Sequence, residues 1–203
     1  MPKPEGPVAR RADYAFDLDV EHADALSLIR AYHYAGGGAN TSTVRTIMRR
    51  EGVPVGAALW MPPTARAAKG LALRLLGAAD RHKQVLVLSR LVVAPSEPQN
   101  AAGLLLGQST REVVRAQRWA LIATYADEAQ GHEGTIYRAT GWTFDGWTVP
   151  TKTWHLDGRQ VSAYVASTPR TIAQMRALGA TCVVSRKRRF VKLIDPTPSP
   201  KAR

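Results

Sequence analysis

The stretch WALIATYADEAQGHEGTIYRATGW, from Trp119 to Trp142, decides the fold. Its first part, residues 119–125, is an apolar run without alternation, which is typical of a strand buried on both faces. A polar, glycine-rich turn begins at Asp127, and the spacing after it predicts a short helix over residues 133–140. Strand, acidic turn and helix together place Asp127 and Tyr137 at the carboxyl edge of a parallel sheet, where α/β proteins bind their ligands.

The overall composition is that of one globular domain. The chain has 203 residues, of which 45% are hydrophobic, enough to bury a core. No apolar stretch approaches the length of a membrane span, and the first residues lack the apolar segment of a secretory signal. The single cysteine, Cys182, excludes an internal disulfide and a cysteine-based metal site. We therefore expect a cytoplasmic protein without a membrane partner.

The charge balance is the strongest compositional signal. Lysine and arginine total 28 against 16 acidic residues, which gives a net charge of +12 and a pI near 10.4. Such an excess usually means a polyanionic partner, most often nucleic acid and less often anionic lipid or a phosphate-rich cofactor. Arginine usage in a GC-rich genome would explain the preference for arginine but not the deficit of acids. We expect contact with nucleic acid.

Three regions are expected along the chain. Residues 1–12 are proline-rich and basic and predict a flexible arm. Residues 13–195 carry all the periodic segments and are expected to form a single catalytic domain. Residues 196–203 are expected to be a disordered tail.

The order of the predicted elements indicates an α/β fold. Before the central stretch, the expected elements are a strand (14–20), a helix (21–31), a hairpin (41–50 and 53–61), a basic helix (64–82), a buried strand (85–93) and a long helix (101–118). After it come a strand (142–149), a hairpin (153–164), a helix opened by Thr168 and Pro169 and closed at Gly179, and a short strand (181–185).

Two polar pairs interrupt apolar or helical segments. His33 and Tyr34 immediately precede three glycines, which would let the backbone approach a ligand; the alternative is a helix end with two half-buried aromatic side chains. Ser89 and Arg90 lie inside the strand 85–93, where alternation would place Ser89 with Val87 and Arg90 with Leu88. A guanidinium there needs a partner. Either an internal pair with Asp127 or a bound anion would provide one.

A basic cluster closes the ordered part of the sequence. Arg186, Lys187, Arg188 and Arg189 are consecutive and precede Phe190. Basic residues next to an aromatic side chain suit contact with phosphates, and we expect these four residues to bind DNA. The alternative is a solvated tail.

The chain resembles the GNAT acyltransferases in element order and in one motif. The motif runs from Tyr137 to Trp142 and is similar to the family's tyrosine-bearing helix with its Gly-aromatic turn. The resemblance implies a mixed, twisted sheet with splayed parallel strands, flanked by helices. It also implies an acyl-donor cofactor on the N-terminus of the long helix, at Asn100, Ala101 and Gly103. The loop before that helix departs from the family pattern, because it holds one late glycine.

A narrower resemblance is to the phage Mom proteins. It is carried by five pieces in order: His33-Tyr34, Leu88-Ser89-Arg90-Leu91, Tyr125-Ala126-Asp127, Gly131-His132-x-Gly134-x-Ile136-Tyr137 and Arg186-Lys187-x-Arg189-Phe190-Val191. The resemblance implies an enzyme that places a carbamoylmethyl group on N6 of adenine in double-stranded phage DNA and shields it from host restriction. It also implies that Arg90 and Tyr137 are required and that His33, Tyr34 and Asp127 hold an iron ion, Fe(II).

Such a reaction assigns roles to the candidate residues. The adenine must leave the base stack, and Tyr34, Trp142 or Trp147 would stack against it. Asp127 would accept the N6 proton, Tyr137 would orient the donor, and Arg90, beside Ser89, would bind the donor's phosphate or carboxylate or hold Asp127. The donor would be acetyl-CoA or an aminoacyl-tRNA such as glycyl-tRNA, which would make tRNA a second partner.

Two other functions fit the same sequence. One is an N-acetyltransferase that uses acetyl-CoA on a small molecule or a protein, with an incidental basic surface. The other is a DNA-binding relative of the fold without catalytic activity. Mass spectrometry of nucleosides from the DNA of cells that express the protein separates these three functions.

Overall fold

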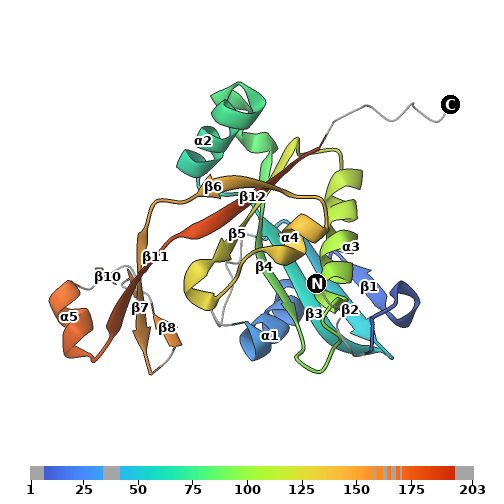
Figure 1. Ribbon diagram of the computed structural model, residues 1–203, viewed down its shortest axis with the longest axis horizontal. Helices are drawn as coiled ribbons and strands as arrows, with labels where there is room; N and C mark the ends of the chain where they lie inside the picture. Colours follow the sequence, from blue (N-terminus) through green and yellow to red (C-terminus); the bar gives the residue numbers. More distant parts are fainter. Residues whose placement is uncertain are drawn as a thin grey trace.

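The computed structural model describes residues 7–33, 42–157, 159–161, 164–165, 168–169 and 171–194, and its main sheet forms the centre of the molecule (Figure 1). In the described part of the chain this sheet has seven strands. Their spatial order is β1 (Ala15–Leu18), β2 (Val44–Arg50), β3 (Val53–Met61), β4 (Val85–Val93), β5 (Leu121–Asp127), β12 (Lys187–Leu193) and β6 (Thr143–Trp147). Neighbouring strands are antiparallel except for β4 and β5, which are parallel.

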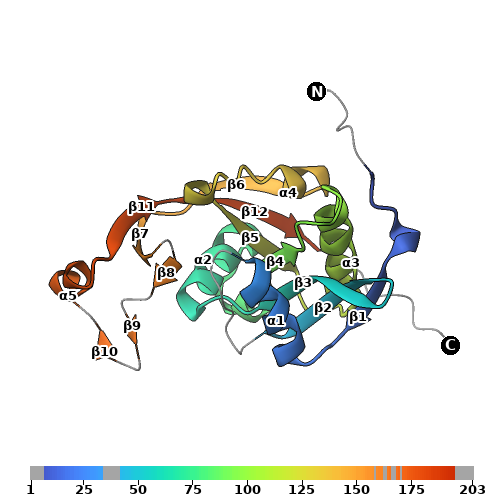
Figure 2. The same cartoon turned by 90° about the horizontal axis from the view of Figure 1, so that it is seen from below.

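Helices cover both faces of the main sheet (Figure 2). Helices α1 (His22–Tyr32) and α2 (Ala65–Leu76) pack their apolar residues on one face, which we call the α1/α2 face. Helices α3 (Ala101–Arg115) and α4 (Thr135–Ala139) lie on the other, the α3/α4 face, which includes Trp60, Leu88 and Phe190. Three short 3₁₀ turns complete these layers: η1 (Arg11–Asp13), η2 (Ala79–Gln84) and η3 (Glu128–Gln130). No helix of the described residues is long and apolar enough to cross a membrane.

Strands β4 and β5 part halfway along their length. Their parallel pairing runs from Val85 with Leu121 to Leu88 with Thr124 and then stops, although both strands continue. Strand β5 stays paired with β12 along its whole length, down to Asp127 with Lys187. The predicted α/β fold, a mixed sheet with splayed parallel strands flanked by helices, is confirmed.

A β-bulge in β4 corrects the predicted side-chain alternation. The register with β3 shifts between Leu59 paired with Arg90 and Trp60 paired with Leu88. The extra residue reverses the alternation, so Arg90 does not share a face with Leu88. Leu88 packs on the α3/α4 face, whereas Arg90, opposite Leu59, lies on the α1/α2 face.

The insertion between β6 and β12 projects from the main body (Figure 1), and its described part forms a three-stranded sheet and a separate two-stranded sheet. Its described elements are β7 (Thr151–Leu156), β8 (Arg159–Val161), β9 (Tyr164–Val165), β10 (Thr168–Pro169), α5 (Ile172–Ala177) and β11 (Thr181–Ser185). The hairpin of β7 and β8 matches the prediction. The helix start was placed too early: Thr168 and Pro169 pair with β9, and Thr171 caps α5 instead.

Two other boundaries differ from expectation. The predicted helix over residues 64–82 ends at Leu76, because Gly77 adopts a left-handed conformation, and η2 follows it. In the predicted flexible arm, residues 7–12 are anchored: Ala9 is buried, and its N–H donates to Asn100 Oδ1 at 2.8 Å. The remaining residues of the arm, 1–6, and the predicted tail, 196–203, lie outside the described residues.

One carboxylate joins the edge strand β6 to the rest of the α1/α2 face. Asp145 accepts hydrogen bonds from Arg74 of α2 and, at 2.6 Å, from Nε of Arg189 in β12. Burial alone would raise the pKa of the Asp145 carboxyl, but the hydrogen bonds from both arginines outweigh it and hold the pKa below its ordinary value. Its ionised form therefore stabilises the fold.

We expect Asp145→Asn to lower the free energy of unfolding at pH 7 by about 1–2 kcal/mol, because two guanidinium groups lose an ionic acceptor. The wild-type advantage is present above the ordinary carboxyl pKa of about 4 and is lost as the pH falls through the lower folded-state pKa. Urea unfolding between pH 2 and 7 measures it. Asp80→Asn, at an exposed position of η2, is the control; equal losses in both variants would contradict the assignment.

Candidate active site

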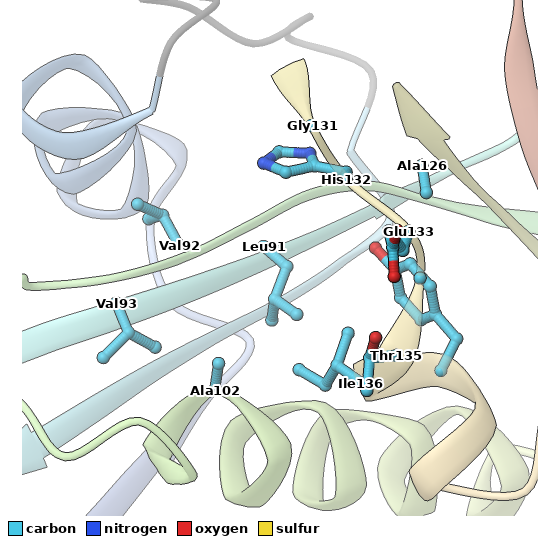
Figure 3. Close-up of a pocket in the computed structure, with 12 residues that line it drawn as sticks. Leu91, Val92, Val93, Ala102, Ala126, Gly131, His132, Glu133, Thr135 and Ile136 are labelled. Carbon is cyan, nitrogen blue, oxygen red and sulfur yellow. The ribbon is translucent and has the colours of Figure 1, made fainter. Parts of the chain in front are cut away.

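A pocket of about 520 Å³ opens on the α3/α4 face where β4 and β5 part. Figure 3 shows Leu91 and Val93 of β4 on one side and Ile136 of α4 on another, with Ala102 of α3 below them. These side chains make the walls apolar. The polar groups come from the segment that follows β5, and they are His132, Glu133, Thr135 and Tyr137. A pocket of this size with few polar groups is typical of a small-molecule or nucleobase site.

Helix α4 fixes the ring of Tyr137 beside the pocket. The ring lies 5.3 Å from that of Phe190 and 5.9 Å from that of Trp142, measured between centroids. Gly141 adopts the predicted left-handed conformation, and the N–H of Trp142 donates to the Tyr137 carbonyl at 2.9 Å. The short helix, its glycine cap and two aromatic neighbours therefore hold the phenol in place.

Gly134 permits the close packing under the pocket. It has a φ of 75°, and a Cβ at this position would lie 2.1 Å from the Phe190 ring. Any larger residue must displace Phe190 or α4. Gly134 belongs to the Gly131-His132-x-Gly134 motif of the sequence. The contact that requires a glycine there is with Phe190 of β12, more than fifty residues later in the chain.

Asp127 is held by groups of the fold rather than presented to the pocket. The whole residue is only 6% exposed. Its Oδ1 atom accepts a hydrogen bond from the Ala129 N–H at 3.1 Å and another from the Ser185 hydroxyl at 3.4 Å. Oδ2 makes an ion pair with Lys187 at 3.2 Å. Asp127 therefore joins the end of β5 to β12.

His33 and Arg90 lie together on the α1/α2 face. His33 follows α1, and Arg90 donates to the Ser89 carbonyl at 2.7 Å, while the Ser89 hydroxyl donates to the Leu59 carbonyl. Burial, and then the charges of Arg90, His132 and Lys187, lower the pKa of His33 to about 4. The surroundings of His33 are thus positive and suit an anion.

The predicted site residues form two groups. His33, Arg90 and Asp127 belong to the α1/α2 face, and Lys187 joins them. Tyr137 lines the pocket from the α3/α4 face. His132 is common to both groups, since it lines the pocket and also lowers the pKa of His33. Tyr34 lies outside the described residues.

The described residues do not fit the expected iron site. Both oxygens of Asp127 are already bonded, and His33 lies near two cationic side chains, Arg90 and Lys187, that would repel a metal ion. No group of three or more metal-ligating side chains occurs among the described residues.

The expected cofactor residues are used within the fold. The Asn100 side chain makes two hydrogen bonds with the backbone of Ala9, at 2.8 and 2.9 Å. The N–H of Ala101 donates to Pro98 and that of Gly103 to the Asn100 carbonyl. An anion at the start of α3 would therefore have to be bound by other groups.

The four basic residues expected to bind DNA lie on two faces. Lys187 pairs with Asp127 and Arg189 with Asp145, both on the α1/α2 face. Arg188 donates to the His132 carbonyl at 3.1 Å, and Arg186 pairs with Glu128 at 3.2 Å. Both guanidinium groups lie over Trp147, with their central carbons 4.9 and 4.0 Å from the ring centroid.

One of the expected stacking residues belongs to the core. Trp142 is 4% exposed, and its ring stacks on Trp60 at 6.1 Å between centroids. It cannot receive a base without unfolding α4. Trp147 is half-buried at the end of β6 and remains accessible.

The sequence interpretation missed two features of the site. Glu133, which lines the pocket, was expected only as part of a helix. The ion pair between Lys187 and Asp127 was not predicted, because it depends on the register of β12 against β5. An acidic residue next to the Gly131-His132 turn was the available signal for Glu133.

The fold, with its pocket between splayed strands, is the fold of the GNAT acetyltransferases. An acetyltransferase from Salmonella typhimurium, solved with acetyl-CoA, superposes with a TM-score of 0.56 at 10% identity over 93% of this chain and 98% of that chain. A Bacillus subtilis acetyltransferase solved with CoA gives 0.54 at 8% identity over 90% and 99% of the two chains. The IAA acetyltransferase of Bacillus cereus gives 0.53 at 8% identity over 89% and 99%.

The particular family follows from the sequence itself. The model of the Mom protein family matches residues 18–192, and the chain belongs to that family. No functionally curated protein matches the chain by sequence. The resemblance inferred from the five sequence pieces is thereby confirmed.

We expect Gly134→Ala to destabilise the fold more than Gly131→Ala. Both glycines have positive φ, so both substitutions carry backbone strain of about 1–3 kcal/mol, but only Gly134 has a neighbour that its Cβ would strike. The additional loss, about 1–3 kcal/mol, is measured by urea denaturation. Equal losses would mean that Phe190 and α4 move aside at no cost.

Proposed function

We propose that this chain is a transferase that places a carbamoylmethyl group on N6 of adenine in double-stranded DNA. The observation that carries the proposal is membership of the Mom family over residues 18–192, in a chain whose pocket lies at the parted strands. A net charge of +12 supports a polyanionic substrate. In a phage genome such an enzyme would act in the host cytoplasm and protect the DNA from restriction.

The substrate adenine must leave the duplex to enter the pocket, at a cost of a few kcal/mol. The apolar walls formed by Leu91 and Ile136 suit a flipped base, and the exposed polar segment at Glu133 suits its amino group. Trp147, beside Arg186 and Arg188, is a half-buried aromatic side chain that could contact the duplex.

The first bond joins N6 to the acyl carbon of the donor: one N6 proton is lost and the donor's leaving group departs, the tRNA 3′-hydroxyl from glycyl-tRNA or the thiol of CoA from acetyl-CoA. A glycyl group has the same atoms as a carbamoylmethyl group and needs only rearrangement, whereas an acetyl group would need a separate source of the amide nitrogen and an oxidant. His132 and Glu133 line the pocket and are placed to accept that proton. Tyr137 would orient the reacting groups by hydrogen bonding. Arg90, with Lys187 and the Asp127 that pairs with it, supplies the positive surroundings for an anionic donor group.

The donor is proposed to be acetyl-CoA or glycyl-tRNA. The Salmonella typhimurium and Bacillus subtilis proteins of the same fold, solved with acetyl-CoA and CoA, support the first. Asn100, Ala101 and Gly103 make hydrogen bonds within the protein, which leaves fewer groups to bind the diphosphate of a coenzyme. Glycyl-tRNA should therefore be tested in parallel with acetyl-CoA.

The function is tested by mass spectrometry of nucleosides from DNA incubated with purified protein and each donor. We expect a new adenine adduct with the wild type and at least a tenfold lower yield with Tyr137→Phe. Tyr125→Phe, a phenol that packs on the α1/α2 face, is the matched control and should retain the yield.

Full product from Tyr137→Phe would remove this phenol from the chemistry. No adduct from the wild type with any donor would reject the proposed reaction. Acetylated small molecules or proteins without a DNA adduct would instead identify an N-acetyltransferase.

A further inference from the structure

Strand β12 separates its basic residues by face. Lys187 and Arg189 point to the α1/α2 face, where carboxylates neutralise both. Arg188 and Lys192 lie with Phe190 on the α3/α4 face. Within the described residues neither makes an ion pair; Arg188 donates to the His132 carbonyl and Lys192 to the Thr140 carbonyl, at 3.1 and 3.3 Å. Carbonyls hold these side chains in place without removing their charge.

Helix α4 adds a cation between these two residues. Arg138 is exposed, and its guanidinium carbon lies 5.5 Å from the centroid of the Phe190 ring. It too makes no ion pair among the described residues. Positive groups therefore follow one another along the α3/α4 face of β12, from Arg188 past Arg138 to Lys192.

A second pocket, of about 340 Å³, lies at the Lys192 end of this row. Lys192 lines it together with Arg111 and Arg115 of α3, and none of its lining residues in the described part of the chain is acidic. Glu112 pairs with Arg115 at 2.7 Å, so a net positive charge remains. Thr110 also lines this pocket; the residue is only 8% exposed, and its hydroxyl has no hydrogen-bond partner among the described residues.

An oxyanion is the ligand that these groups require. A buried hydroxyl without a partner is destabilising, and a phosphate oxygen would accept its hydrogen bond. The surrounding ammonium and guanidinium groups would balance the phosphate charge.

The row has the length of a nucleic-acid contact. From Arg188 to Lys192, four residues of extended strand span about 13 Å. Double-stranded DNA rises about 3.4 Å per nucleotide of one strand, so this length matches about four nucleotides. Arg188 bonds to His132 at the rim of the active-site pocket, and Arg111 lies about 13 Å along α3 from Ala102 in its wall.

We propose that these residues form a cationic track that binds the phosphate backbone of double-stranded DNA, with one phosphate seated in the 340 Å³ pocket against Thr110. The members of the track are Arg188, Arg138, Lys192, Arg111 and Arg115. The inference rests on the proposed function, for which it names the surface that carries the substrate.

The test is the salt dependence of binding to a fluorescein-labelled duplex of about 20 base pairs, measured by anisotropy between about 50 and 200 mM salt. The variant Arg111→Gln with Arg138→Gln removes two track charges. The control, Arg66→Gln with Lys69→Gln, removes two exposed charges from α2 on the opposite face.

The track variant should lower the slope of log K against log salt by about two and weaken binding about tenfold or more, and the control should change neither. Thr110→Val should weaken binding a few-fold and leave the slope unchanged. Equal losses in track and control variants would overturn the proposal, since the effect would then be net charge alone.

Two further arms identify the ligand. Inorganic phosphate at constant ionic strength should compete only weakly with the duplex; saturation by free phosphate without any effect on DNA binding would assign the pocket to a small phosphate and overturn the proposal. Loss of tRNA binding with unchanged duplex binding would overturn it as well.

The proposed function fails independently. If wild-type protein yields no adenine adduct and only the track variant has a lower slope of log K against log salt, the track is supported and the proposed reaction is rejected. If the adduct forms and both double variants bind the duplex equally, the proposed reaction is supported and the track is rejected.

Discussion

The unequal pairing of β5 is the constraint on which the rest of the structure depends. Strand β5 pairs with β12 along its whole length but with β4 only as far as Thr124 opposite Leu88. Beyond that point β4 stays with β3 and β5 stays with β12, so the two parallel strands must diverge. The Asp127–Lys187 ion pair closes the outer end of the β5–β12 ladder. An open pocket therefore follows from hydrogen bonds that are satisfied elsewhere.

The same strand organises the electrostatics. Alternation along β12 sends Lys187 and Arg189 to carboxylates on one face and leaves Arg188 and Lys192 bonded to neutral carbonyls on the other. With 28 basic and 16 acidic residues the chain cannot pair every cation. Carboxylates on the α1/α2 face hold strands of the sheet together, and part of the excess charge, on Arg188, Arg138 and Lys192, lies on the α3/α4 face.

Local features were predictable from the sequence and non-local ones were not. The buried strand before Asp127, the short helix of Tyr137 and the turn at Gly141 depend on neighbouring residues, and all were predicted. The face of Arg90 was predicted wrongly because a bulge depends on the register with β3. The partner of Asp127 lies sixty residues away, and no local pattern encodes it.

The two-sided arrangement of the candidate residues suits a reaction with two large substrates. Tyr137 and the polar segment at His132 face the side on which the unneutralised cations lie, which is where a duplex would approach. Arg90 and His33 face the opposite side, among positive charges that would attract an anionic donor. Because β4 and β5 have parted, no ladder of hydrogen bonds separates the two sides at this edge. The acid and the guanidinium thus lie on one face and the phenol on the other, beside the point where the two strands part.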